Sequence, residues 1–153
     1  MAKAVVALCS AILLLGAGFH LYWGFGGRLG AGVALPQRED GTPAIKETAV
    51  GAMAVGLILV LVLLLVLGFA GVVRLPVPQQ LLNACIVVWT FIFMARALSW
   101  SRYFGLFKQV RATRFARYDT WFYSPSCLLL GWAFSISLCH RRRIEPSATI
   151  RQR

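Results

Sequence analysis

The longest uncharged stretch of the chain constrains its fold most. Residues 49–73 run for 25 positions without a charged side chain. As a helix rising about 1.5 Å per residue, this stretch spans roughly 37 Å, whereas the hydrocarbon layer of a bilayer is about 30 Å thick. The stretch is too long and too apolar for a soluble core, so we expect it to cross a membrane with some tilt.

The composition agrees with lipid as the solvent. Of the 153 residues, 59% are hydrophobic and only 14% are charged, and the mean hydropathy is +0.72. A soluble domain carries about 45–50% apolar and about 25% charged residues. The length leaves no room for a membrane part and a sizeable soluble part together, so we expect one domain.

Four uncharged spans are each close to the length of about 20 residues that a crossing helix needs. They lie at residues 4–27, 49–73, 77–95 and 120–139. Backbone in lipid must satisfy its own hydrogen bonds, so each span is predicted to be helical. The expected fold class is an all-α integral membrane protein. It has a four-helix transmembrane bundle over residues 1–140, a polar, arginine-rich loop between the third and fourth helices, and a disordered basic tail at 141–153.

The first span and the charge pattern bear on topology. The first span follows Lys3 as a signal peptide would, but its apolar run exceeds a typical h-region, so we expect a retained helix. An even number of spans places both termini on one side, where seven Lys and Arg residues lie, against nine on the other side. This difference does not decide the orientation by the positive-inside rule. The Arg141–Arg143 triplet abuts the last span, so we expect cytoplasmic termini in a multi-pass protein of the cell membrane.

The net charge of +11 indicates a partner class. The cationic residues lie between and after the apolar spans, so the natural counter-surface is the bilayer with its anionic lipids. Nucleic acid is not an expected partner. The four cysteines show no C-x-x-C spacing, and we find no metal-ligand cluster, phosphate loop or nucleophile elbow. We therefore expect no metal and no cofactor.

Polar chemistry gathers on the face opposite the termini. On the first helix, His20 is an ionisable residue within a span, which is a functional hypothesis by default. A neutral His20 that bonds a neighbouring helix is the structural alternative. Tyr22 and Trp23 fit either a binding site or an interfacial aromatic belt. Ser124 and Pro125 read as the start of the fourth helix, with Ser124 as the N-cap.

The segment before the fourth span is rich in cations. On a helical wheel its cations spread round most of the circle, which a membrane-surface helix would avoid, so some should point inward or pair. These cations are Arg102, Lys108, Arg111, Arg114 and Arg117. Asp119 is the acidic residue nearby, and Arg117 or Arg114 is its expected partner. Arg96 is either an interface anchor or part of a buried polar cluster.

A cationic pocket closed by aromatic side chains would suit a phosphate, a carboxylate or a lipid headgroup. A plain interfacial loop is the alternative. The candidate ligand-binding residues are His20, Tyr22, Trp23, Arg96, Tyr103, Lys108, Arg114, Arg117, Asp119 and Tyr123.

Three stretches of sequence carry a family resemblance. HLYWGFGG at 20–27, Leu35-Pro36, and RYFGLFKQVRATRFARYDTWFYSPSCL at 102–128 resemble the bacterial membrane family catalogued as domain of unknown function 3995. The string F-A-R-x-D-T-x-x-Y-S-P-x-C is the most specific part. The resemblance implies a small four-helix membrane protein and supplies no activity. The chain departs from the family pattern with Ser99-Trp100-Ser101, where a Gly-Asp pair is expected.

The resemblance implies a set of signature positions. They are His20, Tyr22, Trp23, Gly27, Pro36, Arg96, Tyr103, Gly105, Lys108, Phe115, Arg117, Asp119, Tyr123, Ser124 and Pro125.

Three functions stay open. The first is a binding or transport-type protein that recognises an anionic small molecule or lipid headgroup in the cationic, aromatic-lined pocket. The second is a membrane-embedded enzyme in which His20 and Asp119 are the candidate catalytic acid and base. The third is a structural or assembly protein. None of the four expected spans contains Asp or Glu, so antiport through an embedded carboxylate is not expected.

Overall fold

The computed structural model describes residues 3–46 and 48–150, and its elements are helical. They are α1 (Lys3–Gly24), α2 (Ala31–Ala34), α3 (Ala49–Phe69), α4 (Gln79–Ala97), α5 (Arg114–Tyr118), the π-helical turn η1 (Asp119–Tyr123) and α6 (Ser124–Ile150). Four helices are long and apolar enough to cross a membrane, and the fourth of these spans runs from Arg114 to Arg141. The predicted all-α membrane bundle is confirmed.

Local chemistry sets the end of α1 and both ends of α3. α1 ends at Gly24, short of the predicted residue 27, and Gly26 follows with a positive φ of 88° that stops the helix. The hydroxyl of Thr48 accepts from the backbone N–H of Gly51 at 3.1 Å and caps the start of α3. α3 ends at Phe69, before Gly71 at φ 74°.

The fourth helix begins earlier than the sequence predicted. The hydroxyl of Thr113 accepts from the backbone N–H of Ala116 at 3.1 Å and caps α5. α5, η1 and α6 then form one continuous helix, because Tyr118 and Ser124 both have helical backbone angles. The prediction of a helix start at Ser124 is therefore wrong, and Ser124 is an interior residue.

A wider helical turn explains how Pro125 is accommodated. In η1 the N–H of Ser124 donates to the carbonyl of Asp119, five residues back. Proline has no N–H and its ring clashes with the carbonyl four residues earlier in a regular helix. The wider turn just before Pro125 removes that conflict and lets the helix continue.

The end of the chain also differs from expectation. The sequence predicts a disordered tail at 141–153, whereas α6 continues as helix to Ile150. Residues 151–153 lie outside the described residues.

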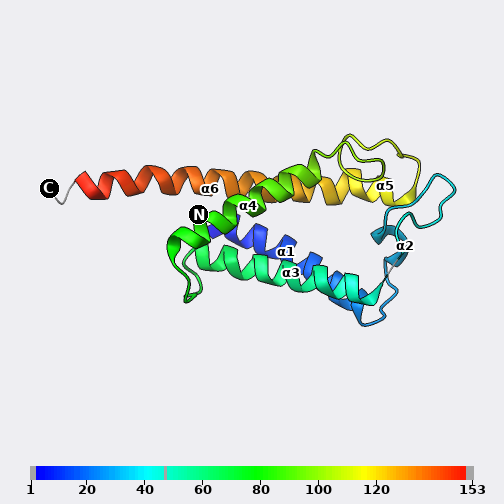
Figure 1. Cartoon of the computed structure of the whole chain (residues 1–153), viewed down its shortest axis with the longest axis horizontal. Helices are drawn as coiled ribbons and strands as arrows, with labels where there is room; N and C mark the ends of the chain where they lie inside the picture. The colour runs from blue at the N-terminus through cyan, green and yellow to red at the C-terminus, as the bar shows by residue number, and fades with distance from the viewer. Residues whose placement is uncertain (1–2, 47, 151–153) are drawn as a thin grey trace.

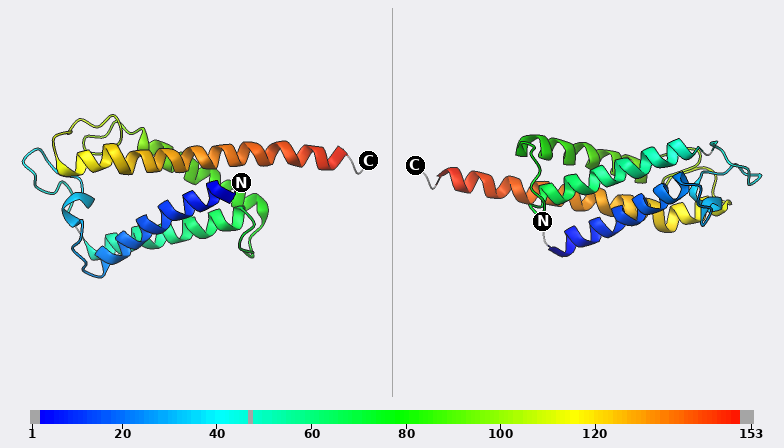
Figure 2. Two further views of the ribbon diagram at one scale, coloured as in Figure 1. Left: turned by 180° about the vertical axis from the view of Figure 1, so that it is seen from behind. Right: turned by 90° about the horizontal axis from the view of Figure 1, so that it is seen from below.

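The four long helices form two pairs (Figures 1 and 2). α1 packs along α3, and α4 packs along α6. The start of α1, the α3–α4 connection and the end of α6 lie toward one end of the bundle, here called the terminal end. α2, α5 and the loop 98–113 lie at the other end, here called the α5 end. The topology therefore agrees with an even number of spans.

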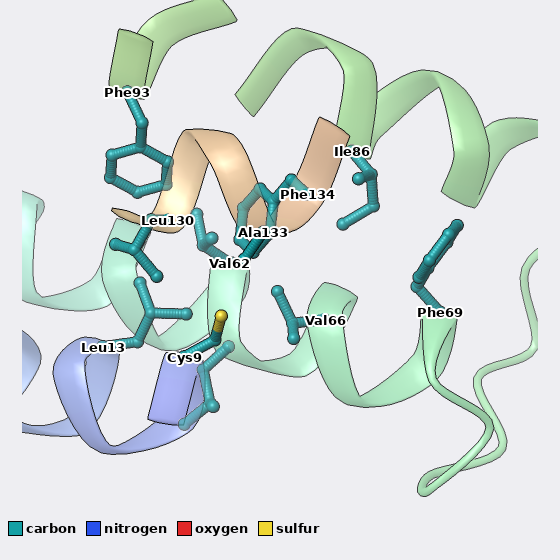
Figure 3. Packing of buried hydrophobic residues seen from close by; sticks show 11 residues of the cluster. Cys9, Leu13, Val62, Val66, Phe69, Ile86, Phe93, Leu130, Ala133 and Phe134 are labelled. Carbon is teal, nitrogen blue, oxygen red and sulfur yellow. The ribbon is translucent and has the colours of Figure 1, made fainter. Parts of the chain in front are cut away.

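The hydrophobic core joins all four long helices (Figure 3). Leu13 of α1, Val62 of α3, Ile86 of α4 and Phe134 of α6 are all buried in it. Within each pair, glycine allows close approach: a Cβ on Gly56 would lie 2.8 Å from the Leu21 side chain, and one on Gly131 would lie 2.7 Å from Met94.

Candidate functional site

Asp119 is the buried centre of an ion cluster, which we define as Arg96, Lys108 and Asp119. Asp119 has no exposed surface. Its Oδ1 accepts from Nη2 of Arg96 at 2.7 Å, and its Oδ2 accepts from Nζ of Lys108 at 3.0 Å. The backbone N–H of Gly105 donates to Oδ2 at 2.9 Å. Both carboxylate oxygens are therefore occupied.

This arrangement corrects the expected pairing of Asp119. The sequence suggested Arg117 or Arg114 as its partner, and that prediction is wrong. Those two arginines are exposed, whereas the paired cations come from the end of α4 and from the loop before α5. The helical wheel placed residues only on their own segment, so it could not rank cations across two helices.

Lys108 is buried with all its donors used. The side chain is only 1% exposed. Besides Asp119, its Nζ donates to the carbonyl of Gly105 at 3.1 Å and to the hydroxyl of Thr120 at 2.7 Å. An ammonium group has three donors, and here each has an acceptor, which makes the burial of this charge tolerable.

Arg96 belongs to the buried polar cluster, one of the two alternatives left open by the sequence. Its guanidinium carbon lies 4.9 Å from the centre of the Phe104 ring, a cation–π distance. Within the described residues, Nη1 of Arg96 and the hydroxyl of Ser124 are buried without a hydrogen-bond partner. Two cations and one carboxylate leave the cluster with a formal charge of +1.

The loop that carries Lys108 depends on one glycine. Gly105 has φ 93°, and a Cβ there would lie 2.5 Å from the carbonyl oxygen of Ser99. Only glycine can hold this conformation and still present its N–H to Asp119. The hydroxyl of Ser99 accepts from the N–H of Ser101 at 3.1 Å, and the hydroxyl of Ser101 donates to the carbonyl of Phe104 at 2.7 Å. Serines thus brace the loop where the family pattern suggested Gly-Asp.

The π-helical turn aligns Asp119 with Ser124. In a regular helix, residues five apart lie about 140° from one another around the axis. The wider turn takes up the extra residue and returns Ser124 to the face of Asp119. Both residues are fully buried as a result.

The predicted residues on α1 are engaged locally. Nδ1 of His20 lies 2.8 Å from the carbonyl oxygen of Gly16, and its ring is 5.2 Å from that of Trp23. Nε1 of Trp23 donates to the carbonyl of Leu29 at 2.8 Å, while the hydroxyl of Tyr22 accepts from the N–H of Leu29 at 3.4 Å. Tyr22 and Trp23 therefore hold the turn after α1. Within the described residues, no hydrogen bond, ion pair or ring contact joins His20 to the ion cluster.

A separate groove lies at the α5 end. It has a volume of about 440 Å³ and is lined by Val33 of α2 and by Arg114, Arg117 and Tyr118 of α5. Both arginines are exposed, and neither forms an ion pair within the part of the chain that the structure describes. Two exposed guanidinium groups beside an aromatic ring form the cationic surface of this groove.

Tertiary hydrogen bonds hold the groove together. The hydroxyl of Tyr123 donates to the carbonyl of Val33 at 3.2 Å, and the N–H of Phe115 donates to Oε1 of Gln37 at 3.2 Å. The ring of Tyr118 stacks on that of Tyr123, with 6.5 Å between centres. These contacts join α2 and the first loop to the helix that carries the arginines.

The first loop also contains a self-contained acidic turn. The hydroxyl and the N–H of Thr42 donate to Oδ1 of Asp40 at 2.6 and 2.9 Å. These hydrogen bonds, helped by the nearby Arg38, hold the pKa of Asp40 below its ordinary value. Asp40 is therefore ionised and satisfied within its own turn at neutral pH.

The structure thus divides the ten predicted ligand-binding residues among several places. Arg96, Lys108 and Asp119 form the ion cluster, Arg114 and Arg117 line the groove, and Tyr123 supports it. His20, Tyr22 and Trp23 lie on α1, and Tyr103 lies against Arg102, with 5.6 Å from the guanidinium carbon to the ring centre.

Sequence reasoning did not assign roles to Thr120, Val33 and Gln37. Thr120 follows Asp119 directly, which is a usable signal. Gln37 and Val33 bond to partners that are 78 and 90 positions further along the chain, and contacts at such separations leave no local sequence pattern.

Comparison with known proteins identifies the family of the chain. A family model described as "Protein of unknown function (DUF3995)" matches residues 13–134, well over half of the chain, which includes the ion cluster and the groove. No curated protein matches the chain. No solved structure matches it either. The chain therefore belongs to the DUF3995 family, as its sequence motifs indicated.

Proposed function

We propose that this protein is a membrane binding protein that holds an anionic group in the groove between α2 and α5. The group is a phosphate or carboxylate, carried by a small molecule or by a lipid headgroup. The observation that supports this most is the pair of exposed arginines, Arg114 and Arg117, beside Tyr118 in a groove of about 440 Å³. Guanidinium groups bind phosphate and carboxylate through paired hydrogen bonds.

The length of the fourth span supports a position for the groove in the headgroup layer. The span covers 28 residues from Arg114 to Arg141, or roughly 42 Å of helix, against about 30 Å of hydrocarbon. At the terminal end, Arg141 lies 4.6 Å from the centre of the Phe69 ring and donates to Asn83 at 3.4 Å. The helix therefore has length to spare at the α5 end, where lipid phosphates lie.

The ion cluster favours binding over the alternative of acid–base catalysis. An acid or base must reach the proton that it transfers, either directly or through one water. Asp119 is fully buried, and both its oxygens already accept hydrogen bonds from Arg96, Lys108 and Gly105. The cluster alone would suit a purely structural protein. The groove is the observation that favours a ligand.

We also propose that the termini are cytoplasmic and that the groove faces away from the cytoplasm. The support is the Arg141–Arg143 triplet at the terminal end of the last span, where positive charge acts most strongly on topology.

A charge-matched pair of double variants tests the proposed function. Arg114→Gln with Arg117→Gln removes both groove cations, and Arg28→Gln with Arg102→Gln removes two exposed cations elsewhere at the α5 end. Binding is measured for sn-glycerol 1-phosphate by calorimetry and for phosphatidylglycerol by native mass spectrometry of the detergent-solubilised protein. The groove variant should bind at least one of these about tenfold more weakly, because charged hydrogen bonds are lost.

The control arm decides the result. Thermal unfolding should be nearly the same in both double variants, since all four arginines are exposed. Equal affinities in the two double variants, for both probes, would refute the groove as an anion site.

A further inference from the structure

We infer that the anion is the head of a lipid, and that one of its apolar chains lies between the two helix pairs at the α5 end. This inference rests on the proposed function, because it assumes that Arg114 and Arg117 hold the head. It goes beyond the binding of the head, because it also requires an apolar chain of the lipid to occupy a space within the hydrocarbon layer.

The exposure along α3 carries the inference. Val62 and Val66 lie in the core with no exposed surface. Ile58 and Val55 lie on the same helix stripe, four and seven residues before Val62, yet they are 43% and 40% exposed. This stripe of α3 is therefore buried in the core toward the terminal end and exposed toward the α5 end.

The direction of this stripe follows from its neighbours. Gly56 packs against Leu21, and Leu59 lies over Gly16, so these residues of α3 face α1. Val55 and Ile58 are turned from that face toward the side on which Val62 meets Leu130 and Phe134 of α6 (Figure 3). Their exposed surface therefore looks toward the α4–α6 pair.

α1 shows the same change. Cys9, Leu13 and Ala17 are buried, and the next position on their stripe is His20, which is only partly buried. The helix pairs meet near the terminal end and diverge toward the α5 end (Figure 1 and the left view of Figure 2). Helix direction and side-chain exposure thus agree that the two pairs are parted there.

The surroundings favour an acyl or prenyl chain as the occupant. Val55 and Ile58 are apolar and lie within a membrane span, so an apolar occupant is favoured over water. At the α5 end of the opening, α2 and α5 carry the groove with its two arginines. A lipid with an anionic head matches both parts at once, whereas a neutral helix from a second copy has no need of the arginines.

The test fills the opening and leaves the groove unchanged. Val55→Trp and Ile58→Trp place bulk on the uncovered stripe, and Leu57→Trp is the matched control, because Leu57 is 61% exposed on another side of α3. We expect Val55→Trp and Ile58→Trp to lower phosphatidylglycerol retention about tenfold in native mass spectrometry. Binding of sn-glycerol 1-phosphate should be unchanged in all three variants. The double variant Val55→Ser with Ile58→Ser makes the same stripe polar without adding bulk. It should also weaken phosphatidylglycerol retention.

The outcomes separate the two proposals. If Val55→Trp and the double serine variant retain as much phosphatidylglycerol as Leu57→Trp, the proposed site for the apolar chain is overturned. The groove variants then still decide whether the arginines bind the anionic head. A loss of dimer in size-exclusion chromatography on Val55→Trp, with lipid retention unchanged, would assign the opening to a second copy and overturn the inference. Retention that depends on Val55 but not on Arg114 and Arg117 would overturn the inference as stated, while binding of sn-glycerol 1-phosphate by the groove variants would still decide the proposed function.

Discussion

A single carboxylate organises the chemistry of the α5 end. Asp119 receives hydrogen bonds from the end of α4 and, through Lys108 and the backbone N–H of Gly105, from the loop before α5, so two segments depend on it. Lys108 depends on Asp119 in turn, because a buried ammonium without a counter-charge is costly. The cluster holds two cations and one anion, which makes the effects of its members unequal.

Removing the anion should therefore cost more than removing one cation. Asp119→Asn leaves the buried Lys108 and the partly exposed Arg96 without a counter-charge and should lower the free energy of unfolding by about 3–5 kcal/mol. Lys108→Met leaves the Arg96–Asp119 pair intact and should cost about 1–3 kcal/mol, from hydrogen bonds lost at Gly105 and Thr120. Thermal and denaturant unfolding in detergent measures both. Asp40→Asn is the control carboxylate in an exposed turn, and it should change stability little. A cost for Lys108→Met equal to that of Asp119→Asn would contradict the charge argument.

At the level of elements, the joint between α5 and α6 decides which residues share a face. η1 adds one residue to a turn and thereby brings Asp119 and Ser124 to the same side while Pro125 continues the helix. Deletion of Phe122, which is 57% exposed, would turn η1 into a regular turn without rotating Asp119 away from Ser124. Pro125 would then clash with a carbonyl.

The deletion and its rescue form one prediction. Deleting Phe122 should cost about 3 kcal/mol of stability, the penalty for proline inside a regular helix, and adding Pro125→Ala should recover most of that loss. Phe122→Ala is the control for the lost ring. The measurement is thermal unfolding followed by circular dichroism. A deletion that is tolerated with Pro125 in place would show that the wider turn does not exist to accommodate the proline.

The hydrophobic pattern of the sequence predicted the existence of the four long helices better than it predicted where they begin and how they connect. Long uncharged runs revealed four crossing helices, because the cost of burying charge in lipid leaves a plain signal. The same signal misplaced the start of the fourth helix, because Arg114, Arg117 and Asp119 interrupt it while Thr113 caps it. Serine before proline is a common helix start, and a π-helical turn at that place has no local signature. The partners of Asp119 come from positions 11 and 23 residues away, which depends on how α4 meets the following loop.

At the scale of the whole molecule, the chain consists of two helix hairpins. α1 with α3 forms the first, and α4 with α6 forms the second. Both loops at the α5 end contribute to the candidate site: the first supplies Val33, and the second leads into the arginines of α5. The proposed function therefore requires that both loops lie on one side of the membrane.

Cysteine labelling checks that requirement. In a background with the four native cysteines replaced, Arg28→Cys and Arg111→Cys each place one thiol at the α5 end, and Arg74→Cys places one at the terminal end. A membrane-impermeant maleimide applied to intact cells should label positions 28 and 111, because both are exposed and proposed to face outward. Position 74 should react only after permeabilisation. Labelling of positions 28 and 111 from opposite sides of the membrane would exclude a groove to which both loops contribute.

The division into hairpins has a consequence for how the protein is made. Arg96, Lys108 and Asp119 all belong to the second hairpin, so the carboxylate and both of its cations meet within one stretch of nascent chain. The first hairpin has its own glycine-mediated contact and can integrate beforehand. The two halves can then dock late in biogenesis, through the hydrophobic core and through the hydrogen bonds of Val33 and Gln37 with the second hairpin.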